Sequence, residues 1–337
     1  MLARCNPVRE VAGIDPQALP DAILQGTQPV VIRGLISNWP MVQAGLESTH
    51  AASTYLRSFH RDATVGAWFG APEIGGRFFY NDDFSGFNFR AERLRLDQVL
   101  DQLSQHDHDA KPPAIYVGST TIDTCLPGFR AENALDLRER QPLISVWIGN
   151  RTRIAAHHDL PDNLACVAAG HRRFTLFAPD QLGNLYIGPL DFTPAGQAIS
   201  LVDFANPDLA KFPKFDDALN HAQVADLGPG DAIFIPSMWW HHIEALDSFN
   251  VLVNYWWRQS PEYMDTPMNA LMLALMSIRD LPVEQREAWQ NIFRHYVFEP
   301  DDGTVGHIPE HARRVLSPLD AKTARELRAQ LLKRFNR

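Results

Sequence analysis

The chain has 337 residues, of which 45% are hydrophobic and 21% charged, a composition typical of a globular protein with a substantial core. Its formal net charge of −9 argues against nucleic acid or an anionic membrane surface as a partner. Cys5, Cys125 and Cys166 are scattered and fit neither a disulfide framework nor a Cys-x-x-Cys metal site. There is no signal-peptide core and no run of the ~18 apolar residues that cross a membrane, so we expect a cytoplasmic protein.

Short β-type runs broken by Gly, Pro, Asn and Asp dominate the chain from about residue 63 to residue 260. They follow a mixed N-terminal part with one expected strand, Pro29–Ile32. Many short strands separated by turns predict a β-sandwich or a double-sheet jelly roll. The expected strands are Ala114–Val117, Ile144–Ile148, Leu164–Ala168, Arg173–Phe177, Ala232–Ile235 and Asn250–Trp256.

The pattern changes to helical after Pro261. Composition and spacing predict helices over 268–278, 283–297 and 321–335. We therefore divide the chain into a β-rich domain, residues 1–260, and a C-terminal helical extension, residues 261–337. An apolar face of the extension has two interpretations that the sequence leaves open: a homodimer contact, or packing against its own β-domain.

Two short stretches contain residues suited to one metal site. In His157-His158-Asp159, strand alternation would aim His157 and Asp159 to the same face and His158 to the opposite one. A distal imidazole comes from His241 or His242, which follow the Gly228–Asp231 turn. Two imidazoles and a carboxylate on one face of Fe(II) leave positions open for a co-substrate and O2, as in non-haem iron oxygenases.

The wider context of these residues resembles a known family. The stretches that carry the likeness are His157-x-Asp159, Asn163, Gly170–Pro179, Val202–Asp208, Phe212–Phe215 and Gly228–His241. Together they are similar to the cupin-like, JmjC-type Fe(II)/2-oxoglutarate oxygenases, most of all to asparaginyl hydroxylases of the type of factor inhibiting HIF. The resemblance covers about residues 20–260 and makes 1–260 the catalytic domain.

The resemblance implies a mainly β fold, a double-stranded β-helix of the cupin or jelly-roll type with flanking helices and a C-terminal helical segment. It implies Fe(II) as the metal, with His157, Asp159 and His241, rather than His242, as ligands. It also implies 2-oxoglutarate as co-substrate and O2 as oxidant, with release of succinate and CO2. The substrate would be a protein side chain or a small metabolite.

The resemblance also assigns a seat for the co-substrate. Arg172 falls where the family has a lysine for the distal carboxylate, Tyr116 matches a tyrosine that binds the same group, and Asn163 and Asn254 match amides near the metal. Arginine can bind a carboxylate through two parallel hydrogen bonds. A second departure is Ile154, where the family has a threonine hydroxyl. These departures keep open a metal-dependent cupin enzyme that does not use 2-oxoglutarate; a non-catalytic binding module is the third alternative.

Aromatic residues cluster in Gly66–Phe69, Arg77–Tyr80 and Tyr255–Trp257. Such clusters are more typical of a core than of a substrate cleft, so we predict that they are core. The stretch Phe84–Phe89 is broken by a glycine and predicts an exposed loop that could line the entrance of the site.

Overall fold

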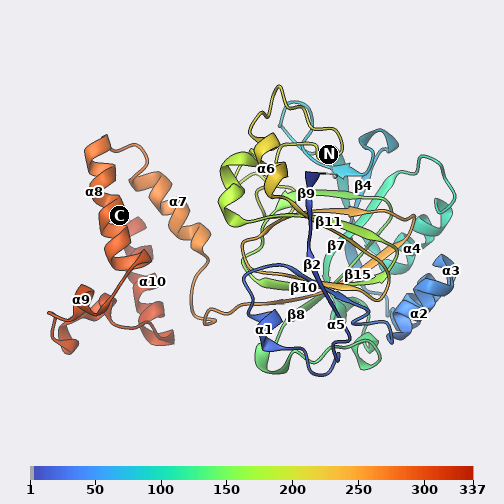
Figure 1. The fold of residues 1–337 in the computed structure, drawn as a ribbon, viewed down its shortest axis with the longest axis horizontal. Helices are drawn as coiled ribbons and strands as arrows, with labels where there is room; N and C mark the ends of the chain where they lie inside the picture. The colour runs from blue at the N-terminus through green and yellow to red at the C-terminus, as the bar shows by residue number, and fades with distance from the viewer. Residues whose placement is uncertain (1–3, 337) are drawn as a thin grey trace. The chain divides into compact units, whose positions relative to one another are not determined.

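The computed structural model describes residues 4–336 and divides into two compact units, the first ending at Arg258 and the second beginning at Gln259. All strands of the described residues lie in the first unit, and the second is built from helices (Figure 1). The fold class predicted from the sequence, mainly β with flanking and C-terminal helices, is confirmed.

Two mixed sheets form the first unit. The larger has the order β2 (Arg9–Ala12), β3 (Val30–Arg33), β13 (Ala232–Ile235), β10 (Asp162–Ala169), β15 (Asn250–Trp257), β8 (Leu143–Gly149), β7 (Ala114–Thr121), β4 (Thr64–Gly70) and β6 (Phe89–Arg95). The smaller has the order β1 (Asn6–Pro7), β12 (Gln223–Leu227), β11 (Arg172–Phe177), β14 (Trp240–Ala245), β9 (Arg153–His157) and β5 (Arg77–Phe78). Most neighbours are antiparallel, and the sheets form the predicted double-sheet sandwich.

Each strand predicted from the sequence forms, and β13 has the predicted ends. In the smaller sheet only β11 was predicted with bounds; a strand was expected at His157 without bounds, and β1, β5, β12 and β14 were not predicted. The segment of β14 reads Trp-His-His-Ile-Glu-Ala and that of β9 reads Arg-Ile-Ala-Ala-His, so neither has the run of β-branched residues that marks a strand. Pairing with β11 and with each other defines them instead.

Helices cover the outer face of the larger sheet. They are α2 (Pro40–Glu47), α3 (Thr49–Phe59), α4 (Leu96–Gln105) and α5 (Ile122–Cys125), whereas the short α1 (Asp21–Leu24) lies near the N-terminus. Leu96, Val99, Leu100 and Leu103 of α4 are buried at the i, i+3, i+4 and i+7 spacing of an amphipathic helix. Their side chains join one large core cluster with residues of β7 and β8 such as Ile115 and Val146.

A second core lies between the sheets, where Val31, Ile233 and Leu252 of the larger sheet meet Phe174 and Leu176 of the smaller one. Behind the smaller sheet, α6 (Phe215–His221) packs against residues that include Phe177 and Trp240. The interior between the sheets is therefore filled in one part, which leaves the rest for a cavity.

The second unit contains α7 (Pro267–Ser277), α8 (Val283–Phe293), the π-helical turn Arg294–Phe298, α9 (Asp302–Val305) and α10 (Ala321–Phe335). Asp320 caps α10 by accepting hydrogen bonds from Lys322 N and Thr323 N. Among residues 259–336, Thr304 is the only one classed as buried. None of the described helices combines the length and apolar character that a membrane crossing requires.

Candidate metal centre

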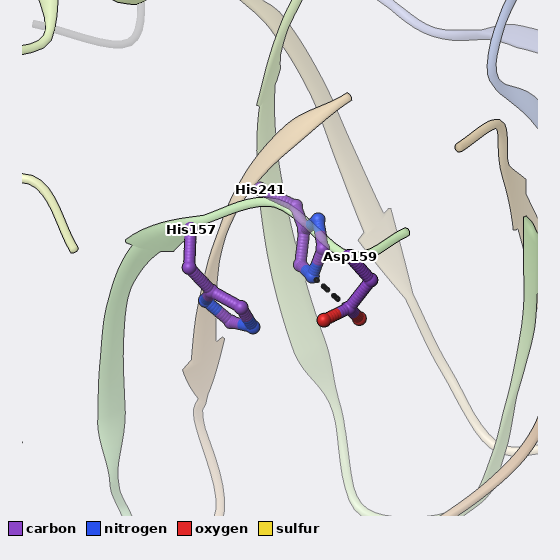
Figure 2. A group of neighbouring side chains, drawn as sticks. All are labelled: His157, Asp159 and His241. Carbon is purple, nitrogen blue, oxygen red and sulfur yellow. Dashed lines mark ion pairs between the residues drawn. The ribbon is translucent and has the colours of Figure 1, made fainter. Parts of the chain in front are cut away.

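Two histidines face each other across neighbouring strands of the smaller sheet. His157 is the last residue of β9 and His241 is the second residue of β14. The antiparallel register pairs them directly, with ring centroids 4.3 Å apart. Directly opposed residues point to the same face of a sheet, and both line the cavity between the sheets (Figure 2). A register shift between His241 and Ile243 marks a β-bulge, a feature that often re-aims side chains beside a site.

A backbone carbonyl holds the Nδ1 atom of each ring. His157 Nδ1 lies 2.9 Å from the carbonyl oxygen of Ala155, and His241 Nδ1 lies 3.0 Å from that of Trp239. Because a carbonyl only accepts, Nδ1 carries the proton and the lone pair of the neutral ring is on Nε2. Burial lowers the pKa of His241 to about 4, which keeps this ring neutral near pH 7. Both rings are thus prepared to bind a metal through Nε2.

The carboxylate of Asp159 completes the group (Figure 2). β9 ends at His157, so Asp159 lies in the following segment. The two side chains come together as predicted, but the predicted cause, alternation along one strand, is wrong. A hydrogen bond of 2.9 Å from Met238 N to the carbonyl oxygen of Asp159 ties this segment to the one before β14. Asp159 Oδ2 lies 3.6 Å from His241 Nε2 and has no hydrogen-bond partner among the described residues. One ligand atom from each of the three residues lies within 4.8 Å of the others.

The two neighbouring histidines lie outside this group. His158 packs edge-on against Trp240, with ring centroids 4.5 Å apart. His242 is buried with its ring 4.5 Å from that of Phe204, and alternation along β14 puts it on the face opposite His241. Of the two distal histidines that the sequence spacing left open, the structure therefore places His241 beside His157 and Asp159.

The three side chains line a cavity of about 520 Å³. Apart from histidines, its charged lining residues are Asp159 and Arg172. Most of the wall is apolar or aromatic, formed by side chains that include Trp68, Phe78, Tyr116, Trp147, Ile154, Ile243, Leu252 and Trp256. A largely apolar cavity with a few convergent polar groups is typical of a small-molecule site, and its one cation outside the histidines suits an anionic ligand.

Arg172 is the first residue of β11 and is 3% exposed. The next residue, Arg173, forms two hydrogen bonds of 2.7 and 2.9 Å to Asp226 on the other face of the strand. Arg172 has no ion-pair partner among residues 4–336, and its Nε atom is buried without a hydrogen bond. Burial lowers the pKa of Arg172 to about 10, so the side chain remains a cation near neutral pH. Of the two adjacent arginines, Arg172 is thus the one that faces inward.

The other predicted co-substrate residues also line the cavity. Burial raises the pKa of Tyr116, which stays protonated and able to donate. Asn254 accepts a hydrogen bond of 2.8 Å from Trp147 Nε1 through its Oδ1, so its NH2 group is the part left for a ligand. Asn163 is buried, and its Oδ1 has no partner among the described residues. All four predicted residues therefore line the same cavity as His157, Asp159 and His241.

The prediction that the aromatic clusters are core is wrong for some of their residues. Trp68, Phe78 and Trp256 line the cavity, whereas Phe69, Tyr255 and Trp257 are core residues as predicted. Strand alternation is the signal that separates them, because Trp256 follows the cavity residue Asn254 by two positions. The lining also includes residues of a loop that the sequence did not point to: Pro194, Ala195, Gln197 and Ile199.

Comparison with known proteins agrees with this geometry. The family model described as a cupin-like domain matches residues 16–263. The chain is 33% identical over 188 residues to lysine-specific demethylase JMJ31 of Arabidopsis thaliana, covering 54% of the chain and 34% of that protein. It is 28% identical over 246 residues to lysine-specific demethylase 8 of Xenopus tropicalis, covering 70% and 49%. It is 26% identical over 243 residues to human tRNA wybutosine-synthesizing protein 5, covering 61% and 72%.

The aligned region spans half or less of the two demethylases. These relatives support the cupin-like JmjC group named from the sequence, whereas the special likeness to asparaginyl hydroxylases stays a prediction.

Proposed function

The chain belongs to the family defined by the cupin-like domain, and on this premise we propose that it is an Fe(II)- and 2-oxoglutarate-dependent oxygenase. It would hydroxylate a protein side chain or a small metabolite, with release of succinate and CO2. The observation that carries the proposal is Arg172, a buried cation with no ion-pair partner among the described residues, in the same cavity as His157, Asp159 and His241. A buried cation is costly unless an anion neutralises it, so the cavity is built to receive one.

The three side chains fit a ferrous ion. Imidazole and carboxylate ligands on one face suit Fe(II) and leave open positions. Asp159 Oδ2 is buried without a hydrogen bond from any of the described residues, which is a cost that a bound cation removes. Once bound, the ion would supply the activation of O2. The chain would hold the ion with His157, Asp159 and His241 and would fix both rings through their Nδ1 hydrogen bonds.

The position of Arg172 suits a short dicarboxylate. Arg172 pairs with Ala245, four positions (245 minus 241) beyond His241 on β14. At roughly 3.3 Å per residue this is about 13 Å along the strand. An extended arginine side chain and a five-carbon dicarboxylate can share that span, with one carboxylate at Arg172 and the other near the metal-binding group. Tyr116 would donate a hydrogen bond to the distal carboxylate.

Two amides would hold the metal-proximal end of the same co-substrate. The bond from Trp147 fixes Asn254 so that its NH2 group can donate, and Asn163 lines the same cavity with an Oδ1 atom that has no hydrogen-bond partner among the described residues. Ile154 lines the cavity and has no hydroxyl to offer, and the forked guanidinium of Arg172 can supply the missing donor.

The substrate is proposed only as a class. The names of the relatives refer to lysine demethylation and to tRNA wybutosine synthesis, and they describe those proteins. For this chain the net charge of −9 opposes binding of nucleic acid, which favours a protein side chain or a small molecule.

Turnover of 2-oxoglutarate tests the proposal. The Fe(II)-loaded protein should consume O2 and form equal amounts of succinate and CO2, and Asp159→Ala should abolish both. Uptake of O2 without succinate would instead indicate a metal-dependent cupin enzyme with another substrate. If the metal-loaded protein consumes neither O2 nor 2-oxoglutarate, the alternative of a binding module replaces the proposal.

A further inference from the structure

Two loops beside the cavity display large apolar side chains next to aspartates. The first is the turn 81–86 between β5 and β6, and the second is the loop 188–199. The second loop lines the cavity through Pro194, Ala195, Gln197 and Ile199. Phe84 in the first loop is 41% exposed, and Leu190 and Phe192 in the second are each 36% exposed.

Contacts around Tyr80 join the two loops. The Tyr80 hydroxyl donates a hydrogen bond of 2.6 Å to the carbonyl oxygen of Phe192. The ring of Tyr80 stacks on Phe84 with centroids 4.8 Å apart and lies 5.6 Å from the ring of Phe192. Phe87 stacks on Phe192 at 5.0 Å. The loops therefore form one surface, which we call the rim and define by its exposed residues Asp82, Asp83, Phe84, Leu190, Asp191 and Phe192.

The first loop holds Phe84 in an unusual conformation. Its φ angle is +58°, in the left-handed region that bulky residues rarely adopt. The Asn81 side chain accepts a hydrogen bond from Gly86 N at 3.1 Å and donates one to Ser85 Oγ at 3.1 Å. Such strain persists only where the surroundings enforce it, and it is often found where a side chain is displayed for binding.

The charge of the rim has one sign. Segments 79–89 and 188–199 contain Asp82, Asp83 and Asp191 and no Lys, Arg or His. Hydrogen bonds from Ser85 lower the pKa of Asp83, which keeps this carboxylate ionised. A concave site edged by like charges attracts ligands of the opposite charge.

We propose that the rim docks a polypeptide segment with Lys or Arg beside an apolar side chain, and that docking presents a neighbouring residue to the cavity. This inference rests on the proposed oxygenase function and names its substrate as a protein segment. Exposed aromatic anchors edged by polar residues are typical of protein interaction surfaces. A small metabolite would be enclosed by the cavity and needs no such anchors, and the negative charge repels nucleic acid.

Binding of short fluorescein-labelled peptides, followed by anisotropy, tests the proposal. One probe contains Lys and Phe spaced by Ser, the second replaces Lys by Glu, and the third replaces Phe by Ala. We expect the first probe to bind and the other two to bind at least about tenfold more weakly. No binding of the first probe, or equal binding of all three, would overturn the proposal.

Variants then locate the binding. Phe84→Ala, and separately the combination of Asp82→Asn, Asp83→Asn and Asp191→Asn, should each weaken binding of the first probe by about tenfold. The triple variant should also flatten the dependence on salt concentration. Leu46→Ala and Glu47→Gln, at exposed positions of α2, are matched controls that should leave binding unchanged. Equal affinity of the controls and the rim variants would place the peptide elsewhere.

The test separates docking from catalysis. His157→Ala should retain binding of the peptide while losing turnover of 2-oxoglutarate. Intact peptide binding in a wild-type protein that never turns over 2-oxoglutarate would contradict the proposed function alone. Normal turnover in a protein with no preference among the peptides would contradict the docking proposal alone.

Discussion

The two units of this chain differ in how far their apolar side chains are buried. In the unit that ends at Arg258, apolar side chains fill cores on both sides of the larger sheet and surround one cavity. In the unit that begins at Gln259, Met276 and Phe298 are more than two thirds exposed (71% and 72%), and Thr304 is the only residue classed as buried among those described. The buried cores stabilise the first unit and fix the positions of the residues around the cavity. The exposed apolar side chains of the second unit would be stabilised by burial against another surface. Of the two interpretations left open by the sequence, a homodimer contact and packing against the chain's own β-domain, we propose the homodimer.

The largest expected effect comes from removing a proposed metal ligand of the first unit. His241→Ala should reduce Fe(II) binding and 2-oxoglutarate turnover by more than the ~10–100-fold typical of residues that only support metal ligands. His307 is an exposed histidine of the second unit, and His307→Ala is the matched control that should leave Fe(II) binding and turnover unchanged. Metal analysis and a succinate assay measure both effects. Equal metal content in the two variants would contradict the assignment.

A matched pair of phenylalanines tests the difference in packing. Phe174 is fully buried between the sheets, and Phe298 is 72% exposed. Phe174→Ala should lower the free energy of unfolding by about 3–5 kcal/mol. Phe298→Ala should change it by no more than about 0.5 kcal/mol in protein kept dilute enough to be monomeric. Denaturant titration measures both, and similar losses would remove the contrast between the units.

The proposed dimer gives the next prediction. Leu332 on α10 is 58% exposed, and Leu332→Glu should weaken self-association by about thirtyfold, as expected for loss of a strong interface anchor. Gln330→Glu introduces the same side chain at a neighbouring exposed position of the helix and should have less effect. Light scattering over a range of protein concentrations measures the self-association of each variant. A wild-type protein that stays monomeric at every concentration would refute the dimer.

Arg172→Met tests whether the buried arginine lowers the free energy of unfolding of the ligand-free protein. The Nε atom of Arg172 is buried without a hydrogen bond, and the side chain has no ion-pair partner among the described residues, so an apolar replacement of similar volume should raise the free energy of unfolding of the ligand-free protein by about 1 kcal/mol or more. Lys111→Met, at an exposed position, is a control for loss of one positive charge. A clear loss of stability in Arg172→Met alone would mean that Arg172 serves the fold.

The sequence predicts the parts of this molecule that have a strong local pattern. The strand Asn250–Trp256 and the helix 321–335 are examples, because apolar β-type residues define one and a capped helical repeat defines the other. It also contains the signal for α4, whose buried leucines have helical spacing, although we did not predict that helix.

The site depends more on tertiary structure. Asp159 reaches the metal group from a segment that is tied to Met238, and no local pattern reports that hydrogen bond. Alternation shows that only one of the adjacent arginines can face inward, and the partner of Arg173, Asp226, lies 53 positions away along the chain. Gln197 lines the cavity from a loop outside the strands. The spacing of residues in the sequence does not predict that contact.

The most direct test of the central claim is an anaerobic titration of the Fe(II)-loaded protein with 2-oxoglutarate, followed by its visible charge-transfer band. We predict a saturable band for the wild type. Arg172→Met should bind 2-oxoglutarate about 10–150-fold more weakly, as expected for loss of a charge-assisted hydrogen bond of roughly 1.5–3 kcal/mol. No band despite bound iron, or equal affinity in the variant, would contradict the proposed binding of 2-oxoglutarate.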